Sequence, residues 1–146
     1  MSTHRTIDQH PAASVWTVSF LPPAKRLSMN DRPHWRTRHR LTKLWRHAAH
    51  TAACAQLGRA PSERARGACM VRVEFPVADP GRRRDPHNQA PTVKAIIDGL
   101  VDAAVWPDDT DDHVVVLDPR FYKPDQPLMM AKVVVNLIPR AGDLPT

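Results

Sequence analysis

The chain has 146 residues, of which 42% are hydrophobic and 25% are charged, and this is enough apolar material for the core of one domain. The composition argues against a disordered polyampholyte, and the apolar runs are far shorter than the ~20 residues of a membrane-spanning helix. Lysine and arginine outnumber aspartate and glutamate by 21 to 15, which gives a net charge of +6. Small domains this basic tend to bind polyanions, nucleic acid first.

The two ends of the chain are polar and show no periodic pattern. We therefore predict loose tails over residues 1–13 and 140–146, and a single domain over residues 14–139. The first tail lacks the apolar stretch of a secretory signal. Cys54 and Cys69 form neither a C-x-x-C pair nor a zinc set, so we expect a cytoplasmic protein with two buried, reduced thiols.

The first half of the sequence predicts a strand, a basic loop and a helix. Residues 15–21 (VWTVSFL) are rich in β-branched and aromatic residues and end before two prolines, which is typical of a strand. Residues 24–40 are expected to form the loop. Apolar residues recur three and four positions apart over residues 41–57, and Gly58 follows them, so we expect an amphipathic helix there.

The second half predicts a strand, a helix and two further strands. The strands are expected over residues 68–77, 114–122 and 130–138, and the helix over residues 91–104, where a proline suits the first turn. Trp106 is expected in the core. The order strand, helix, strand, helix, strand, strand predicts one α+β domain with a mixed sheet of about four strands.

Charge is distributed in two blocks of opposite sign. Residues 25–46 contain eight basic residues against Asp31 alone, whereas residues 98–118 contain seven aspartates and no lysine or arginine. The blocks are interpreted either as solvated faces that attract each other, or as a phosphate-binding surface beside an acidic pocket for a divalent cation. Trp35 lies in the basic block and is expected either to pack in the core or to stack on an opened base.

Aspartates flank the second predicted helix on both sides, and a lysine lies within it. Asp85 precedes this helix, Lys94 lies early in it, and Asp108 and Asp109 follow it. Because a helix over residues 91–104 is about 20 Å long, Asp85 and Asp109 meet only if the chain folds back along it. Carboxylates brought together in this way are the ligands that Mg²⁺ prefers, and a nearby lysine would neutralise charge on a phosphate in the transition state.

Three short motifs in this region resemble those of a known family. They are RRRDPHN, VKAIIDGL and VWPDD. In the RusA family of Holliday junction resolvases, from bacteria and their phages, an arginine-rich loop leads into Asp-x-Asp-Asn. A helix with an early lysine and an Asp-Ala/Gly-Leu stretch follows, and then Trp-x-Asp-Asp. The resemblance is strong over residues 82–123 and weaker over most of the remaining chain.

The resemblance implies a RusA-like fold and a metal-dependent endonuclease. Such a homodimer would cut two opposed strands of a four-way DNA junction symmetrically, with Mg²⁺ or Mn²⁺ as cofactor and no membrane partner. By matching positions, the catalytic residues would be Asp85, Lys94 and Asp109, and the metal ligands Asp85, His87, Asp108 and Asp109. The expected DNA contacts are Arg82, Arg83, Arg84, Asn88, Lys25, Arg36, Arg38 and Arg40.

Two departures from the family pattern leave alternatives open. His87 stands where the family usually has its second aspartate, and the interval from Asp85 to Lys94 is longer, with QAPT as the apparent insertion. Imidazole suits Mn²⁺ better than Mg²⁺. His87 is therefore a ligand or outer-shell group itself, or Asp111 or Asp112 supplies the missing carboxylate, or activity is weak or lost.

The competing interpretations concern both the function and single residues. The alternatives to a junction resolvase are a non-catalytic protein that binds branched DNA, favoured by His87, and a metal nuclease acting on flaps or duplex DNA. Asp85 also suits a turn or a helix cap, and Lys94 is spaced to pair with Asp98. Asp98 and Asp102 are expected to be solvated or structural and not metal ligands.

Overall fold

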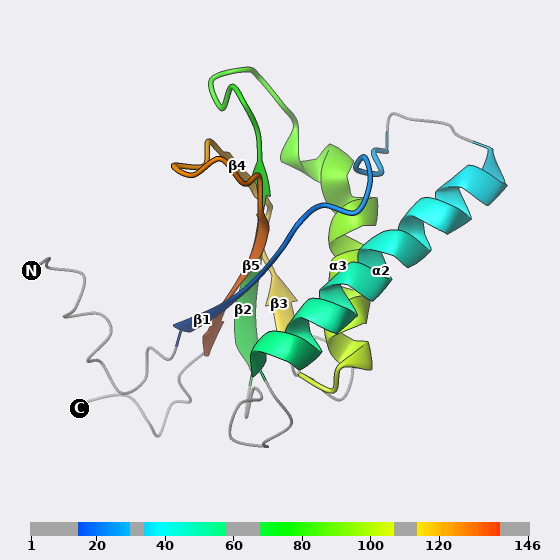
Figure 1. The fold of residues 1–146 in the computed structure, drawn as a ribbon, viewed down its shortest axis with the longest axis vertical. Coiled ribbons are helices and arrows are strands. Elements are labelled where there is room, and N and C mark those ends of the chain that lie inside the picture. Colours follow the sequence, from blue (N-terminus) through cyan, green and yellow to red (C-terminus); the bar gives the residue numbers. More distant parts are fainter. Residues whose placement is uncertain (1–14, 30–33, 58–67, 107–113, 138–146) are drawn as a thin grey trace, which may run out of the picture.

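The computed structural model describes residues 15–29, 34–57, 68–106 and 114–137 (Figure 1). The two predicted tails lie outside these ranges, as do Gly58 and the four aspartates between Trp106 and Val114. No helix of the described ranges is long and apolar enough to cross a membrane.

The described elements follow the predicted order. They are β1 (Val15–Phe20), α2 (Trp35–Leu57), β2 (Cys69–Pro76), the short 3-10 helix η2 (Pro86–Gln89), α3 (Ala90–Asp102), β3 (Val114–Val116), β4 (Arg120–Tyr122) and β5 (Ala131–Leu137). The α+β prediction is confirmed. The five strands form one sheet in the order β1-β5-β2-β3, and β4 also pairs with β2.

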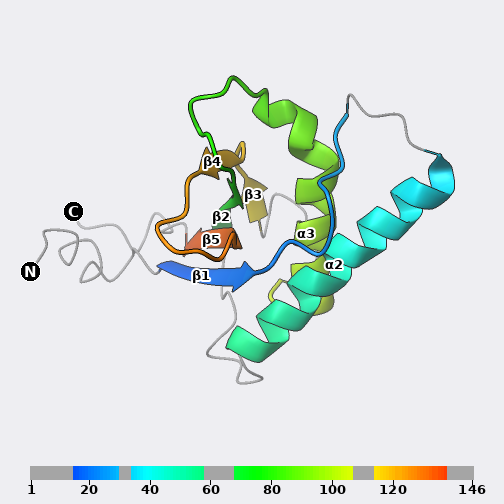
Figure 2. The ribbon, with the colours of Figure 1, turned by 45° about the horizontal axis from the view of Figure 1, so that its top comes forward.

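The sheet is mixed, as predicted. β5 lies between β1 and β2 and pairs antiparallel with both, whereas β3 and β4 pair parallel with β2. Parallel neighbours need a crossover connection, and α3 supplies it between β2 and β3. Figures 1 and 2 show both helices on the same side of the sheet.

The single strand predicted over residues 114–122 is wrong, because β3 and β4 are separated by Leu117, Asp118 and Pro119. Val71 pairs with Val116 and Glu74 with Arg120, so three steps along β2 match four along the other strand. One extra residue opposite a continuous strand has the two-against-one geometry of a β-bulge. The Asp-Pro pair is the sequence signal for this break.

The predicted start of the first helix is also wrong, since α2 begins at Trp35 and not at Leu41. The Nδ1 atom of His34 accepts a hydrogen bond from the Arg36 N–H (3.2 Å), and the His34 carbonyl accepts from the Arg38 N–H (3.0 Å). A side chain that accepts from the second helical N–H acts as an N-cap, and histidine is not among the usual cap signals. Arg36, Arg38 and Arg40 therefore lie on two exposed helical turns and not in a loop.

The core lies between the sheet and the two helices. Its largest fully buried side chains include Trp45 of α2, Phe75 of β2, Ile96 of α3 and Trp106. The expectation that Trp106 is a core residue is confirmed. The expectation that both cysteines are buried is only half right, because Cys69 is buried and Cys54 lies on the exposed side of α2.

Helices α2 and α3 approach closely where α3 has a glycine. A Cβ atom on Gly99 would lie 2.3 Å from the Arg46 carbonyl oxygen and 2.9 Å from the Ala49 Cβ. Beside this contact, the Arg46 guanidinium donates to both carboxylate oxygens of Asp102, at 2.6 and 2.8 Å. The backbone contact and the ion pair fix how α3, and hence its first residues, sits against α2.

Candidate active site and nucleic-acid surface

Asp85 lies at the turn that starts η2. Its carboxylate accepts a hydrogen bond from the His87 N–H (3.0 Å), and its carbonyl accepts from the Asn88 N–H (3.1 Å). Asp85 is therefore a capping residue, as its Asp-Pro context allows, and its side chain is exposed. One carboxylate oxygen takes the capping bond, so the other is left for a second role.

His87 and Lys94 line one cleft of about 290 Å³, together with a residue that the sequence analysis did not single out. This residue is Asp118, in the bulge between β3 and β4. Its Oδ1 atom lies 3.7 Å from Nδ1 of His87, and both side chains are mostly exposed. Bulges often redirect side chains beside active sites, and here the bulge places a carboxylate next to the first turn of α3.

Lys94 lies one turn into α3 and pairs with Asp98. The Nζ–Oδ1 distance is 2.9 Å, at the spacing that the sequence predicted, and the lysine side chain stays 60% exposed. An exposed pair of this kind contributes about 0.3–0.5 kcal/mol. Lys94 lines the cleft. Because its pairing with Asp98 is weak, a phosphate bound in the cleft could replace Asp98 as the partner of the Lys94 amine.

Asp98 and Asp102 contact arginine and lysine side chains. Asp98 lies 4.0 Å from Arg46 and Asp102 makes the two-pronged pair with it. The Arg46 guanidinium holds the pKa of Asp102 below its usual range, while Asp102 raises the pKa of Arg46. Arg46 of the basic block and Asp98 and Asp102 of the acidic block therefore form ion pairs that join α2 to α3.

Two predicted ligands, Asp108 and Asp109, lie outside the described residues, as do Asp111 and Asp112. Among the residues that the structure describes, no group of three His, Cys, Asp or Glu side chains is arranged to hold a metal ion. The convergence of Asp85 with Asp109 stays a prediction. The donors that are described near η2 are carboxylates and one imidazole, the types that Mg²⁺ and Mn²⁺ accept.

The arginine-rich loop after β2 has two exposed members and one that is built into the fold. Arg82 and Arg83 are exposed, whereas Arg84 is half-buried. Arg84 donates to the carbonyl of Asp79 (2.7 Å) and lies 5.4 Å from the centre of the Phe121 ring. The side chains of Arg82 and Arg83 are therefore exposed to solvent, while the hydrogen bonds of Arg84 hold the loop in shape.

The start of α2 carries the predicted aromatic residue on its surface. Trp35 is 66% exposed, which excludes the interpretation that its side chain packs in the core. The Arg36 guanidinium lies 5.2 Å from its ring centre and the His34 ring 5.7 Å away. An exposed indole among cationic groups is the arrangement by which proteins stack on unpaired bases.

The comparisons with known proteins do not add a relative. No protein-family model matches the chain, and no curated protein matches it.

Proposed function

We propose that this chain is a metal-dependent endonuclease that acts on branched DNA and resolves four-way junctions in recombination and repair. The observation that supports this most directly is the composition of the cleft. An imidazole, an amine and a carboxylate from separate segments line it, and Pro86, which directly follows Asp85, lines it as well. Together with the motif resemblance to RusA resolvases, this favours hydrolysis of a phosphodiester over simple anion binding.

Each side chain is assigned one role. Asp85 and Asp109 would hold the divalent ion, with Asp108 and His87 as further ligands, and the bound ion would activate water and stabilise the leaving oxygen. Lys94 would neutralise charge on the phosphate. Arg82 and Arg83 would grip the flanking phosphates, since arginine matches phosphate geometry. Asn88 and the cations Lys25, Arg36, Arg38 and Arg40 would extend the contact along the DNA.

A homodimer fits this substrate. A four-way junction has two equivalent cutting points, and a two-fold symmetric protein would place one active site at each of them. Paired, symmetric cuts are the result expected from such an assembly.

A non-catalytic protein that binds branched DNA is the second candidate function. His87 favours it, because an imidazole in place of a carboxylate weakens a magnesium site. The exposed cationic surface described above would serve either function equally, so only cleavage separates them.

The first prediction concerns the catalytic carboxylates. Substitutions Asp85→Asn and Asp109→Asn remove the charge that holds the ion, so we expect each to abolish cleavage while junction affinity stays the same or rises. The measurement is nicking of synthetic four-way junctions, flaps and linear duplex with Mg²⁺ or Mn²⁺, beside a gel-shift titration. Asp125→Asn, an exposed aspartate after β4, is the matched control and should cut normally.

The substrate panel separates the functions. Paired cuts confined to junctions support the resolvase. Retarded but intact junctions support the binding protein, and cutting of every substrate supports a nuclease of other specificity. Wild-type cutting by Asp85→Asn would show that the site assignment is wrong.

A further inference from the structure

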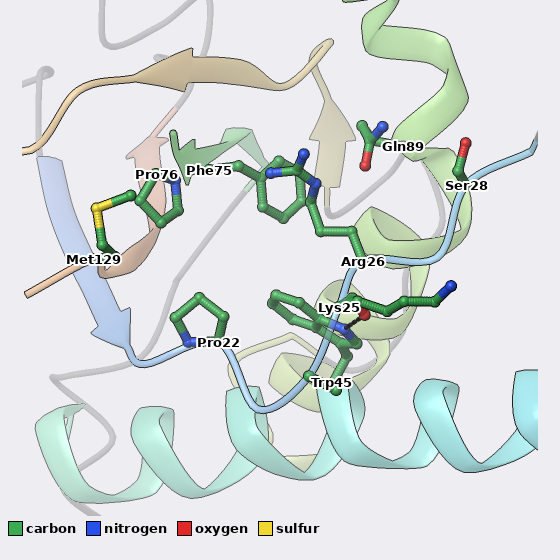
Figure 3. A pocket seen from close by; sticks show the side chains of 10 residues that line it. Pro22, Lys25, Arg26, Ser28, Trp45, Phe75, Pro76, Gln89 and Met129 are labelled. Carbon is green, nitrogen blue, oxygen red and sulfur yellow. Dashed lines mark hydrogen bonds between the residues drawn. The ribbon is translucent and has the colours of Figure 1, made fainter. Parts of the chain in front are cut away.

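A second cavity lies on the other side of η2 from the cleft. Its volume is about 440 Å³, within the range of small-molecule sites. The segment 21–29, here called the strap, forms one wall, and Trp45, Phe75 and Gln89 contribute from α2, β2 and η2 (Figure 3). His87 faces the cleft and Gln89 faces this cavity, so a single turn of η2 separates the two spaces.

The strap is fixed at three points, so the cavity is preformed. The Thr92 hydroxyl accepts from the Leu27 N–H (2.7 Å) and donates to the Leu27 carbonyl (2.8 Å). The Met29 N–H donates to the Asn88 carbonyl (2.8 Å), and the Trp45 indole N–H donates to the Lys25 carbonyl (3.0 Å). These bonds tie the strap to the start of α3 and to the middle of α2. A wall ordered in advance lowers the entropic cost of binding a ligand.

Arg26 gives the cavity a positive charge that the described carboxylates do not neutralise. Its guanidinium lies 5.3 Å from the ring centres of both Phe75 and Phe121. Among the described residues no carboxylate lies within ion-pair distance of it. Burial, and then the charge of Arg84, lowers the pKa of Arg26. Arg26 lines the cavity and feels the like charge of Arg84, so an anion bound there would stabilise both arginines.

Gln89 adds a polar group that no described residue satisfies. The residue is 9% exposed, and its Oε1 atom is buried with no hydrogen-bond partner among the described residues. A buried acceptor without a partner is unfavourable, and a ligand that donates to it would remove this cost. Figure 3 shows Gln89 beside the Arg26 side chain at one end of the cavity, with Pro22, Pro76 and Met129 toward the other.

We propose that this cavity binds one nucleotide of the DNA strand, unstacked from its neighbours, next to the point of scission. Arg26 takes its phosphate, Gln89 accepts a hydrogen bond from an N–H of its base, and the apolar side chains that line the cavity cover the base. Every nucleobase carries such an N–H, so the site holds any base. The proposal rests on the proposed function, since it assigns the cavity to the same DNA strand. Extruding a base costs less where its pairing or stacking is already weakened, and base pairs at an open branch point lack a stacked neighbour on one face, so the cavity favours branched over duplex DNA.

The test uses the full chain with Asp85→Asn, which binds without cutting, and four-way junctions with 2-aminopurine placed in turn at each nucleotide around the branch. 2-Aminopurine fluoresces when it leaves the base stack. We expect a several-fold rise in fluorescence at one position on each cut strand. Adding Gln89→Met, which replaces a buried polar group by an apolar one of similar size, should remove the rise, and Arg26→Gln should weaken junction binding roughly ten-fold or more.

Lys43→Gln removes one exposed positive charge from α2 outside both cavities and serves as the control that should keep the rise. A parallel titration with free deoxynucleoside monophosphates distinguishes a nucleotide within DNA from a free nucleotide. Binding of the free nucleotides without a fluorescence rise in the junction would overturn the proposal. Junction binding with no rise at any position would also overturn it, while leaving the proposed function intact. Failure to bind any DNA would overturn both.

Discussion

At the scale of single residues, the environment of His87 shows how a departure from a motif can be accommodated. The imidazole is exposed and lies 3.7 Å from the Asp118 carboxylate, which comes from the bulge and not from the motif. A separation of 3.7 Å is longer than a hydrogen bond, so Asp118 lies near the imidazole without fixing the orientation of the ring. The sequence motif alone assigns no role to Asp118.

The second prediction tests the imidazole directly. His87→Asp introduces a carboxylate at the position where the RusA pattern has its second aspartate. Because Mg²⁺ prefers oxygen ligands, we expect junction cutting with Mg²⁺ to rise relative to cutting with Mn²⁺. The ratio of the two rates is the measurement, with His47→Asp on the exposed face of α2 as the control. An unchanged ratio would mean that His87 does not contact the ion.

The third prediction concerns Asp102, whose pKa the Arg46 hydrogen bonds lower. A carboxyl with a lowered folded pKa stabilises the fold above its unfolded pKa of about 3.9. That contribution is lost as the pH falls through the folded value. Because the pair is partly exposed, we expect Asp102→Asn to reduce stability by about 0.5–1 kcal/mol at neutral pH, with the difference disappearing at strongly acidic pH. Urea unfolding across this range measures it, and Asp125→Asn should show no such trend.

At the scale of elements, α3 depends on its glycine as much as on its apolar stripe. The stripe explains why α3 is buried, since Val93, Ile96, Ile97 and Leu100 all face the core. Gly99 explains how close α2 lies, because any side chain there would meet the α2 backbone. The position of α3 in turn sets the position of η2, from which His87 and Gln89 face the two cavities.

The fourth prediction is that Gly99→Ala destabilises the protein. The added Cβ would have to push α2 away, and overpacking of this kind costs about 1–3 kcal/mol, more than the ~1 kcal/mol that alanine gains over glycine in a helix. Chemical denaturation measures the loss. Gly81→Ala is the matched control, because a Cβ atom there would meet only the Asp79 carboxylate, at 3.3 Å. Equal stabilities for both variants would contradict the tight helix contact.

At the scale of the whole molecule, the exposed cations gather where both helices begin. In Figure 1 the loop after β2, the end of the strap and the first turns of α2 lie toward the same end of the molecule as the start of α3. Helix N-termini carry partial positive charge and add to the charge of the arginines. This end therefore carries the arginines to which the proposed function assigns the contact with DNA.

The fifth prediction follows from that surface. Arg83→Ala removes one exposed charge, so we expect weaker binding to junctions of every sequence and a salt dependence whose log–log slope is smaller by about one. Gel-shift titrations at several salt concentrations measure the slope. Lys43→Gln, an exposed lysine further along α2, provides the comparison, and an identical loss of slope there would show that the binding surface is not confined to this end.

The sequence by itself determined the fold class, the order of elements and the buried faces of both helices, because hydrophobic periodicity and proline positions act locally. Local patterns were insufficient at three places. The capping role of His34 lies outside the usual cap signals, and the register against β2 creates the bulge at Asp118. The buried oxygen of Gln89 lies where the strap is bonded to η2. The cap at His34 is a local contact of an unusual residue type, whereas the bulge and the Gln89 environment depend on contacts between segments far apart in the chain, which only the tertiary structure decides.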